Sequence, residues 1–182
     1  MQVLITGANG FVGKNLHLHL AERSDVKVQC FTREHTLTDL VQFVSAADIV
    51  FHLAGVNRPE NPEEFNKGNA DLTLQLCDII QKSGKRIPVI YSSSIQAASD
   101  NPYGASKRMA EDALLDFTKN TSSPVFIYRL PNVFGKWARP NYNSAVATFC
   151  FNISKGLPIK INDPKAQVNL VYIDDVIDSF LE

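Results

Sequence analysis

The chain has 182 residues, of which 45% are hydrophobic and 20% charged, the composition of an ordinary globular domain. Its 18 basic and 19 acidic residues leave a formal charge of −1, which excludes the whole-domain basic field of a nucleic-acid binder. No basic leader precedes the first apolar segment and no apolar run is long enough for a membrane span, so we expect neither a signal peptide nor a membrane protein.

Short apolar runs alternate with segments of helical periodicity along the chain. The apolar runs predict strands at residues 2–6, 26–31, 48–53, 87–91, 125–130 and 168–173. The periodic segments predict helices at 11–21, 37–45, 62–82, 102–119 and 143–153, and another that starts at 174. This alternation is typical of an α/β fold, a doubly wound parallel sheet with helices on both faces. Because the last helix reaches only Glu182, we expect a domain truncated at its C-terminus, a fragment of a longer chain.

Cysteine and histidine positions bear on compartment and metal binding. Cys30, Cys77 and Cys150 lie far apart in apolar contexts, so we expect buried thiols in a reducing, cytoplasmic compartment. The four histidines form no cluster with them, and we expect no metal site.

A glycine-rich segment joins the first predicted strand to the first predicted helix. Three glycines at intervals of three allow a tight turn, close approach of a pyrophosphate and close packing of the helix. The helix N-terminus adds free N–H groups and the positive end of its dipole. We therefore predict a Rossmann-like dinucleotide site, with a purely structural turn as the alternative. The site residues are Thr6, Gly7, Asn9, Gly10, Phe11, Val12 and Gly13.

The end of the second strand indicates the type of cofactor. An acidic side chain there favours NAD, but this sequence has Cys30-Phe31-Thr32-Arg33. The guanidinium of Arg33 suits a 2′-phosphate, so we predict NADPH. A solvated surface arginine is the alternative, and Glu34 beside it weakens the preference.

Tyr103 and Lys107 are four residues apart, so on a helix they share a face. Asn101-Pro102 is typical of a helix start, which places Tyr103 in the first turn. A nearby ammonium, the helix end and a bound nicotinamide can lower the pKa of the phenol and make Tyr103 a general acid.

Ser92-Ser93-Ser94 follows an apolar strand and lies at the carboxyl edge of the predicted sheet, where ligands bind in open parallel sheets. A serine hydroxyl there can orient a carbonyl beside Tyr103. A surface helix without a catalytic role is the alternative for the tyrosine and lysine.

Together these motifs resemble the extended, sugar-nucleotide-modifying branch of the short-chain dehydrogenase/reductase superfamily. The resemblance implies one NADP-binding domain over residues 1–182 and a catalytic triad of Ser94, Tyr103 and Lys107. It further implies that Tyr103 and Lys107 contact the cofactor and that His52-Leu53-Ala54-Gly55 lines its adenosine side. Substrate contacts at Asn69 and at Asn132, in Pro131-Asn132-Val133-Phe134-Gly135, also come from the resemblance.

More specific phrases, among them His52-Leu53-Ala54-Gly55-Val56-Asn57-Arg58-Pro59 and Phe134-Gly135-Lys136-Trp137, resemble the CapF family of capsular polysaccharide enzymes and their O-antigen relatives. That bacterial family is bifunctional. Its N-terminal domain uses NADPH to reduce the C4 ketone of a UDP-2-acetamido-2,6-dideoxy-hexulose on the route to UDP-N-acetyl-L-fucosamine. Its C-terminal cupin, a zinc domain, is absent from these residues, so neither epimerisation nor zinc is carried over.

Further substrate contacts are hypotheses, with exposed loop residues as the alternative. They are Arg58, Ser93, Lys136, Trp137 and Arg139. The stretch before Asp174-Asp175 lacks the arginine that many nucleotide-sugar enzymes carry, so Lys136, Arg139 or Lys165 must hold the diphosphate instead. A homodimer through the stripes that include Leu76 and Leu114 is a further expectation, with packing against the sheet as the alternative.

The leading hypothesis from the sequence is therefore a cytoplasmic NADPH-dependent ketoreductase for a UDP-linked keto sugar. Two other functions stay open: an epimerase or 4,6-dehydratase that retains NAD⁺, and a non-catalytic dinucleotide-binding module. Net consumption of NADPH distinguishes the reductase from both.

Overall fold

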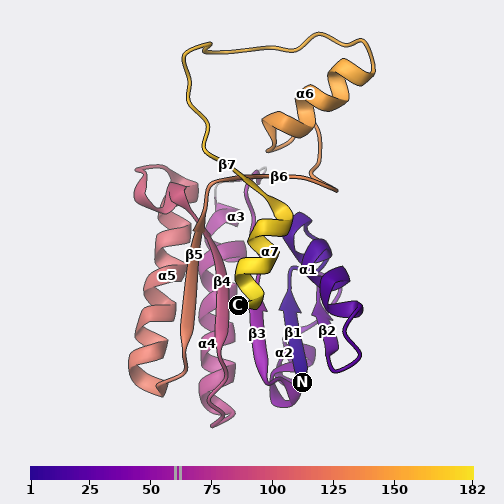
Figure 1. Cartoon of the computed structure of the whole chain (residues 1–182). Helices are drawn as coiled ribbons and strands as arrows, with labels where there is room; N and C mark the ends of the chain where they lie inside the picture. Colours follow the sequence, from indigo (N-terminus) through magenta and orange to yellow (C-terminus); the bar gives the residue numbers. More distant parts are fainter. Residues whose placement is uncertain (60, 62) are drawn as a thin grey trace. The chain divides into compact units, whose positions relative to one another are not determined.

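The computed structural model describes residues 1–59, 61 and 63–182 and divides into two compact units. The first comprises Met1–Arg129 and the second Leu130–Glu182. Each unit is described by itself, with the elements labelled as in Figure 1.

The first unit is built on a five-stranded sheet in the order β2-β1-β3-β4-β5. The strands are β1 (Gln2–Thr6), β2 (Lys27–Phe31), β3 (Ile49–His52), β4 (Val89–Ser94) and β5 (Val125–Leu130). β1 pairs in parallel with β2 and β3, and β3 pairs in parallel with β4. Thr6 lies opposite both Phe31 and His52, so the loops after β1, β2 and β3 leave the sheet from one edge.

Helices flank this sheet, as Figure 1 shows. They are α1 (Phe11–Ala21), α2 (Leu37–Ala46), α3 (Glu63–Phe65), the π-helix η1 (Asn66–Asp71), α4 (Leu72–Lys82), the 3-10 helix η2 (Ile95–Ala98) and α5 (Pro102–Thr121). α2, α4 and α5 bury Leu40, Leu76 and Leu114 in one cluster with Val50 and Tyr91 of the strands. The stripes predicted for a dimer interface therefore bury Leu76 and Leu114 in the core, which confirms the alternative of packing within the chain.

The second unit contains β6 (Asn132–Phe134), α6 (Ala145–Ser154), β7 (Leu170–Tyr172) and α7 (Ile173–Leu181). β6 and β7 pair in parallel as a separate two-stranded sheet. The predicted strand at 168–173 therefore exists in shorter form but outside the main sheet, and its partner β6 was not predicted. Cys150 on α6 is exposed and Cys30 only half-buried, so burial of all three thiols is wrong, and only Cys77 is buried.

The predicted helix at 62–82 is interrupted, and its first residue lies outside the described residues. From Glu63 the chain forms α3, then η1, then α4. A side chain on Gly68 of η1 would collide with the side chain of Val56, so a glycine is needed where this helix passes the loop after β3. None of the helices in the described part of the chain is long and apolar enough to span a membrane.

Candidate active site

The glycine turn after β1 is packed too closely for side chains. Gly7 has φ +72°, and a Cβ on it would lie 2.6 Å from both N and Cα of Ala54. A Cβ on Gly13 would collide with the carbonyl oxygen of Gly7, so α1 also packs directly on the turn. The N–H of Gly7 donates to Phe31 O at 3.0 Å. The turn is thereby held against the ends of both β2 and β3.

The start of α1 suits a pyrophosphate. Gly10 caps the helix without a side-chain hydrogen bond, and the first turn has no acidic residue. Asn9 and Gly10 are exposed, and Phe11 and Val12 are half-buried. Backbone N–H groups at the positive end of a helix dipole, with no side chain in competition, attract an anion. The residues predicted for the dinucleotide phosphates therefore fit that group.

A chain of hydrogen bonds fixes the segment that follows β3. Thr73 Oγ1 donates to Asn69 O at 2.6 Å, so it accepts from Nε2 of His52, at 2.8 Å. His52 Nδ1 then accepts from Thr6 Oγ1 at 2.7 Å, and Thr6 Oγ1 accepts from the N–H of Ala54 at 3.2 Å. Burial, together with the charge of Lys107, lowers the pKa of His52 to about 3. His52 is thus a neutral structural link, and Leu53, Ala54 and Gly55 are placed beside the glycine turn.

Arg33 lies two residues beyond the end of β2 and is exposed. Because Phe31 pairs with Thr6, Arg33 emerges at the same sheet edge as the glycine turn. A guanidinium at this position fits a ribose 2′-phosphate, since it presents a fork of donors to an anion.

Ser94 and Tyr103 meet at the tip of β4, in agreement with the predicted pair. Asn101 caps α5 by accepting from the N–H of Gly104 at 2.8 Å, and Pro102 is the first helical residue, so Tyr103 lies in the first turn as predicted. Burial raises the pKa of Tyr103, and the neighbouring Ser94 hydroxyl acts to lower it. The predicted lowering is therefore not a property of the chain by itself, and the phenol holds its proton at neutral pH.

Lys107 is buried one turn further along α5. Its Nζ donates to Ser92 O at 2.9 Å and lies 4.8 Å from the centroid of the Tyr91 ring. Burial lowers the pKa of Lys107 to about 8, although the charge of Glu111 acts in the opposite direction. A Cβ on Gly55 would lie 3.2 Å from Nζ, so the ammonium reaches the loop after β3. The structure thus brings the third member of the predicted triad to the same edge of the sheet.

Asn69 joins the loop after β3 to α5. Its amide accepts from the N–H of Val56 at 2.9 Å and donates to Val56 O at 3.0 Å and to Ser106 Oγ at 2.9 Å. The side chain is buried, and these three bonds hold the π-helix beside the site. Its predicted contact with substrate stays a prediction, and its observed contacts are structural.

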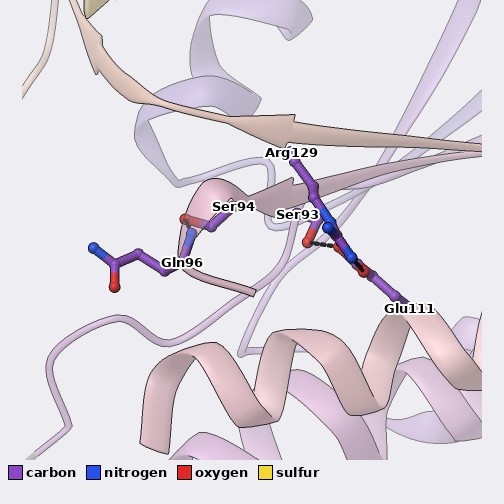
Figure 2. A network of polar contacts seen from close by, with 5 residues as sticks. All are labelled: Ser93, Ser94, Gln96, Glu111 and Arg129. Carbon is purple, nitrogen blue, oxygen red and sulfur yellow. Dashed lines mark hydrogen bonds and ion pairs between the residues drawn. The ribbon is translucent and has the colours of Figure 1, made fainter. Parts of the chain in front are cut away.

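Ser93 belongs to a polar network that the sequence analysis missed (Figure 2). Its hydroxyl donates to the buried carboxylate of Glu111, which also accepts from Arg129 Nη2 at 2.6 Å. The proton of Ser93 is committed to Glu111, so a substrate contact by Ser93 stays a prediction that must use its oxygen. The position of Glu111, four residues after Lys107, is the signal that was available in the sequence.

The other predicted substrate residues divide between the two units. Arg58 is exposed in the first unit. Lys136 lies 3.5 Å from Asp174 and 5.7 Å from the Trp137 ring centroid, and Arg139 lies 5.5 Å from that of Tyr142. Within the second unit, Lys136, Trp137 and Arg139 are exposed, as is Asn132. Among the described residues, no group of three or more histidine, cysteine or acidic side chains can hold a metal ion.

The parallel sheet, the side-chain-free phosphate turn and the Ser94–Tyr103–Lys107 group define a dinucleotide-binding domain of the short-chain dehydrogenase/reductase type. The chain belongs to the NAD dependent epimerase/dehydratase family, whose model matches residues 3–182.

Two relatives narrow the comparison. UDP-2-acetamido-2,6-beta-L-arabino-hexul-4-ose reductase of Pseudomonas aeruginosa is 57% identical over 182 residues, all of this chain and 49% of the relative. The crystal structure of the capsular polysaccharide assembling protein CapF from Staphylococcus aureus matches with a TM-score of 0.89 and 42% identity, over all of this chain and 49% of that one. The chain therefore spans about half the length of these relatives.

A second solved structure shows the fold alone. The UDP-glucuronic acid 4-epimerase of Bacillus cereus, in complex with UDP-glucuronic acid and NAD, matches with a TM-score of 0.87 at 21% identity. The match covers all of this chain and 72% of that one.

Proposed function

We propose that this chain is the reductase part of a nucleotide-sugar enzyme, which uses NADPH to reduce the C4 ketone of a UDP-2-acetamido-2,6-dideoxy-hexulose. The observation that carries the proposal is the meeting of Ser94, Tyr103 and Lys107 at the sheet edge that also holds the glycine turn. The name of the 57% identical Pseudomonas aeruginosa relative, a hexul-4-ose reductase, supports the choice of a 4-keto sugar.

Ser94 orients the ketone in the proposed reaction. The N–H of Gln96 donates to Ser94 Oγ at 3.2 Å, so the serine oxygen is already an acceptor. In the proposed complex, the Ser94 hydroxyl turns its proton from the Tyr103 phenol to the substrate carbonyl. Bound NADPH supplies the hydride that C4 receives. Tyr103 then transfers its phenolic proton to the carbonyl oxygen, which becomes the new hydroxyl. The raised pKa of Tyr103 keeps that proton available at neutral pH.

Lys107 stabilises the phenolate that forms as the proton leaves. A buried ammonium acts more strongly on a developing negative charge than a solvated one, because little water screens it. With its pKa at about 8, Lys107 is mostly cationic at neutral pH. The same ammonium reaches the loop at Gly55, where it can hold the nicotinamide ribose.

NADPH is preferred over NADH in this proposal because of Arg33. The exposed guanidinium follows β2 at the edge where the cofactor's adenosine ribose must lie.

Two outcomes distinguish the reductase from the alternatives that the family name also covers. An epimerase or dehydratase recycles its cofactor without net consumption, and a non-catalytic module binds dinucleotide without any turnover.

The remaining parts of the proposal concern the protein's setting. The substrate contacts are Arg58, Asn69, Ser93, Asn132, Lys136, Trp137 and Arg139. We place the reaction in the cytoplasm, in capsule or O-antigen sugar synthesis, and propose a homodimer. The similarity to CapF, a capsular polysaccharide assembling protein, supports the capsule assignment.

The test is to add NADPH and a panel of UDP-linked 4-keto sugars to the protein and to follow cofactor oxidation by absorbance. Stoichiometric oxidation with the 2-acetamido-2,6-dideoxy sugar is the expected result. Epimerised or dehydrated product without net oxidation, or no reaction with any keto sugar of the panel, contradicts the proposal.

A further inference from the structure

Glu111 is a buried carboxylate that the proposed reaction does not use. It lies on α5 and is 4% exposed. Ser93 donates to one of its oxygens, and Arg129 donates from Nε at 3.0 Å to the same oxygen and from Nη2 at 2.6 Å to the other. Figure 2 shows these three side chains converging between β4, β5 and α5. A buried charge requires such partners, because burial without them costs several kcal/mol.

The place of Glu111 on α5 connects it to the catalytic residues. Tyr103, Lys107 and Glu111 follow one another at intervals of four residues, so they form one stripe along the helix. Three successive residues of β4 bind this stripe. Ser92 O accepts from Lys107, the Ser93 hydroxyl donates to Glu111, and the Ser94 hydroxyl neighbours the Tyr103 phenol and acts to lower its pKa. The strand tip and the helix are thus joined at three consecutive positions, of which Glu111 supplies one.

The charges around Lys107 give Glu111 a second effect. The groups that interact with the ammonium are the Tyr91 ring and Ser92 O of β4, neutral His52 of β3 and Glu111 of α5. Glu111 is the only anion in this set. Hydrogen bonds from Arg129 and Ser93 and the charge of Arg129 hold the pKa of Glu111 below its ordinary value, although burial acts to raise it. The Glu111 carboxylate is therefore ionised throughout the pH range in which Lys107 titrates.

We propose that Glu111 is a positioning residue of the reductase site, which keeps Lys107 cationic and fixes the Ser93 position of β4 so that Ser94 meets Tyr103. Arg129 sets the strength of this effect, because it shares the carboxylate's charge. This inference rests on the proposed function, but its chemistry can be tested on cofactor binding alone.

The experiment measures NADPH affinity by fluorescence across a pH series that spans the titration of Lys107. Glu111→Gln keeps an acceptor for Ser93 and removes the charge, so the affinity should fall at a pH lower by about one unit. Arg129→Gln leaves the charge of the carboxylate less neutralised. The midpoint pH at which NADPH affinity is lost should therefore move to a higher value. A purely structural role does not predict opposite shifts from the two halves of one ion pair.

Asp116→Asn is the matched control. Asp116 is an exposed carboxylate on the same helix, and it pairs with Lys119 at 2.8 Å. Its midpoint should equal that of the unmodified chain. If Glu111→Gln folds and its midpoint is unshifted, the inference is overturned. If that variant does not fold, an unshifted midpoint in Arg129→Gln overturns it. Failure of every keto sugar to react contradicts the proposed function, but the binding series still decides the role of Glu111.

Discussion

The ammonium of Lys107 lies over the ring of Tyr91, with Nζ 4.8 Å from the ring centroid. Tyr91 is fully buried, and on β3 the ring of His52 stacks against it with centroids 5.4 Å apart. An aromatic face stabilises a cation that has lost its water, typically by about 1–2 kcal/mol. The site therefore compensates part of the cost of burying Lys107 with a ring rather than with solvent.

The hydroxyl of Tyr91 has no hydrogen-bond partner within the described part of the chain. Tyr91→Phe removes this unsatisfied group and keeps the ring, so the free energy of unfolding should stay the same or rise by about 1 kcal/mol. Urea denaturation measures the change. Tyr91→Leu is the companion variant, since it also removes the ring from beneath Lys107 and should weaken NADPH binding. A loss of stability in Tyr91→Phe larger than that in Tyr91→Leu contradicts this account.

Tyr103→Phe tests the proton donor. The variant keeps the ring but removes the acid, so turnover of the keto sugar should fall by about 10²–10⁴-fold while NADPH affinity is retained. Steady-state kinetics and fluorescence titration measure the two quantities. Tyr128→Phe on β5 is the control and should keep full turnover. Retained turnover in Tyr103→Phe assigns proton transfer to another group.

Arg33→Ala tests the choice of cofactor. Loss of a charge-assisted pair with the 2′-phosphate should weaken NADPH binding by about 10–100-fold and leave NADH binding unchanged. Arg23→Ala removes an exposed arginine beyond the opposite end of α1, where it pairs with Asp25, and should affect neither cofactor. Equal losses for NADPH and NADH would show that Arg33 does not read the 2′-phosphate.

Alanine substitutions at Gly7 and Gly84 distinguish the stability cost of backbone strain from that of steric crowding. Their φ values are +72° and +68°, but a Cβ on Gly7 meets Ala54 at 2.6 Å whereas one on Gly84 meets nothing within 4 Å. Gly84→Ala should cost only the left-handed conformation, about 1–2 kcal/mol. Gly7→Ala should cost about 1–3 kcal/mol more and should also impair NADPH binding. Urea denaturation of both variants gives the difference, and equal costs contradict the crowding at Ala54.

The sequence predicted those parts of the fold whose signals are local. The apolar runs placed all five strands of the main sheet, and the spacing of Tyr103 and Lys107 placed both on one helix face. β6 was not predicted, and β7 was predicted as part of the main sheet. Each strand has only three residues, and β7 is largely exposed, so their sequence patterns are weak. The interruption by η1 also left no pattern in the sequence, and the close approach of Gly68 to Val56 within it is a contact between distant segments.

The sequence predicted that Tyr103 and Lys107 share a helix face beside the serine-tipped strand, but not the electrostatics of the candidate site. The raised pKa of Tyr103 comes from burial, which spacing along one helix does not reveal. The bonds of Glu111 join α5 to β4 and β5, and no periodicity of one segment reports a contact between three. The four-residue interval from Lys107 to Glu111 was visible, but a charged residue at that interval is more often on a solvated face.

His52 makes the stability of the fold depend on pH. Burial and the charge of Lys107 lower its pKa from 6.5 to about 3 in the folded chain. Below about pH 6.5, His52 is protonated in the unfolded chain but stays neutral in the folded chain. The free energy of unfolding therefore decreases as the pH falls below that value, by up to about 1.4 kcal/mol per pH unit. Between about pH 6.5 and 5 few carboxylates titrate, so this slope belongs mainly to histidine.

His52→Gln should therefore lower the stability at neutral pH, since it breaks the links to Thr6 and Thr73, and should flatten the slope between about pH 6.5 and 5. Urea denaturation at closely spaced pH values measures both effects. His17→Gln, an exposed substitution on α1, should keep the slope. An unchanged slope in His52→Gln would show that His52 is not the group responsible for the pH dependence of stability. The hydrogen-bond chain from Ala54 to Asn69 would then not depend on a neutral imidazole.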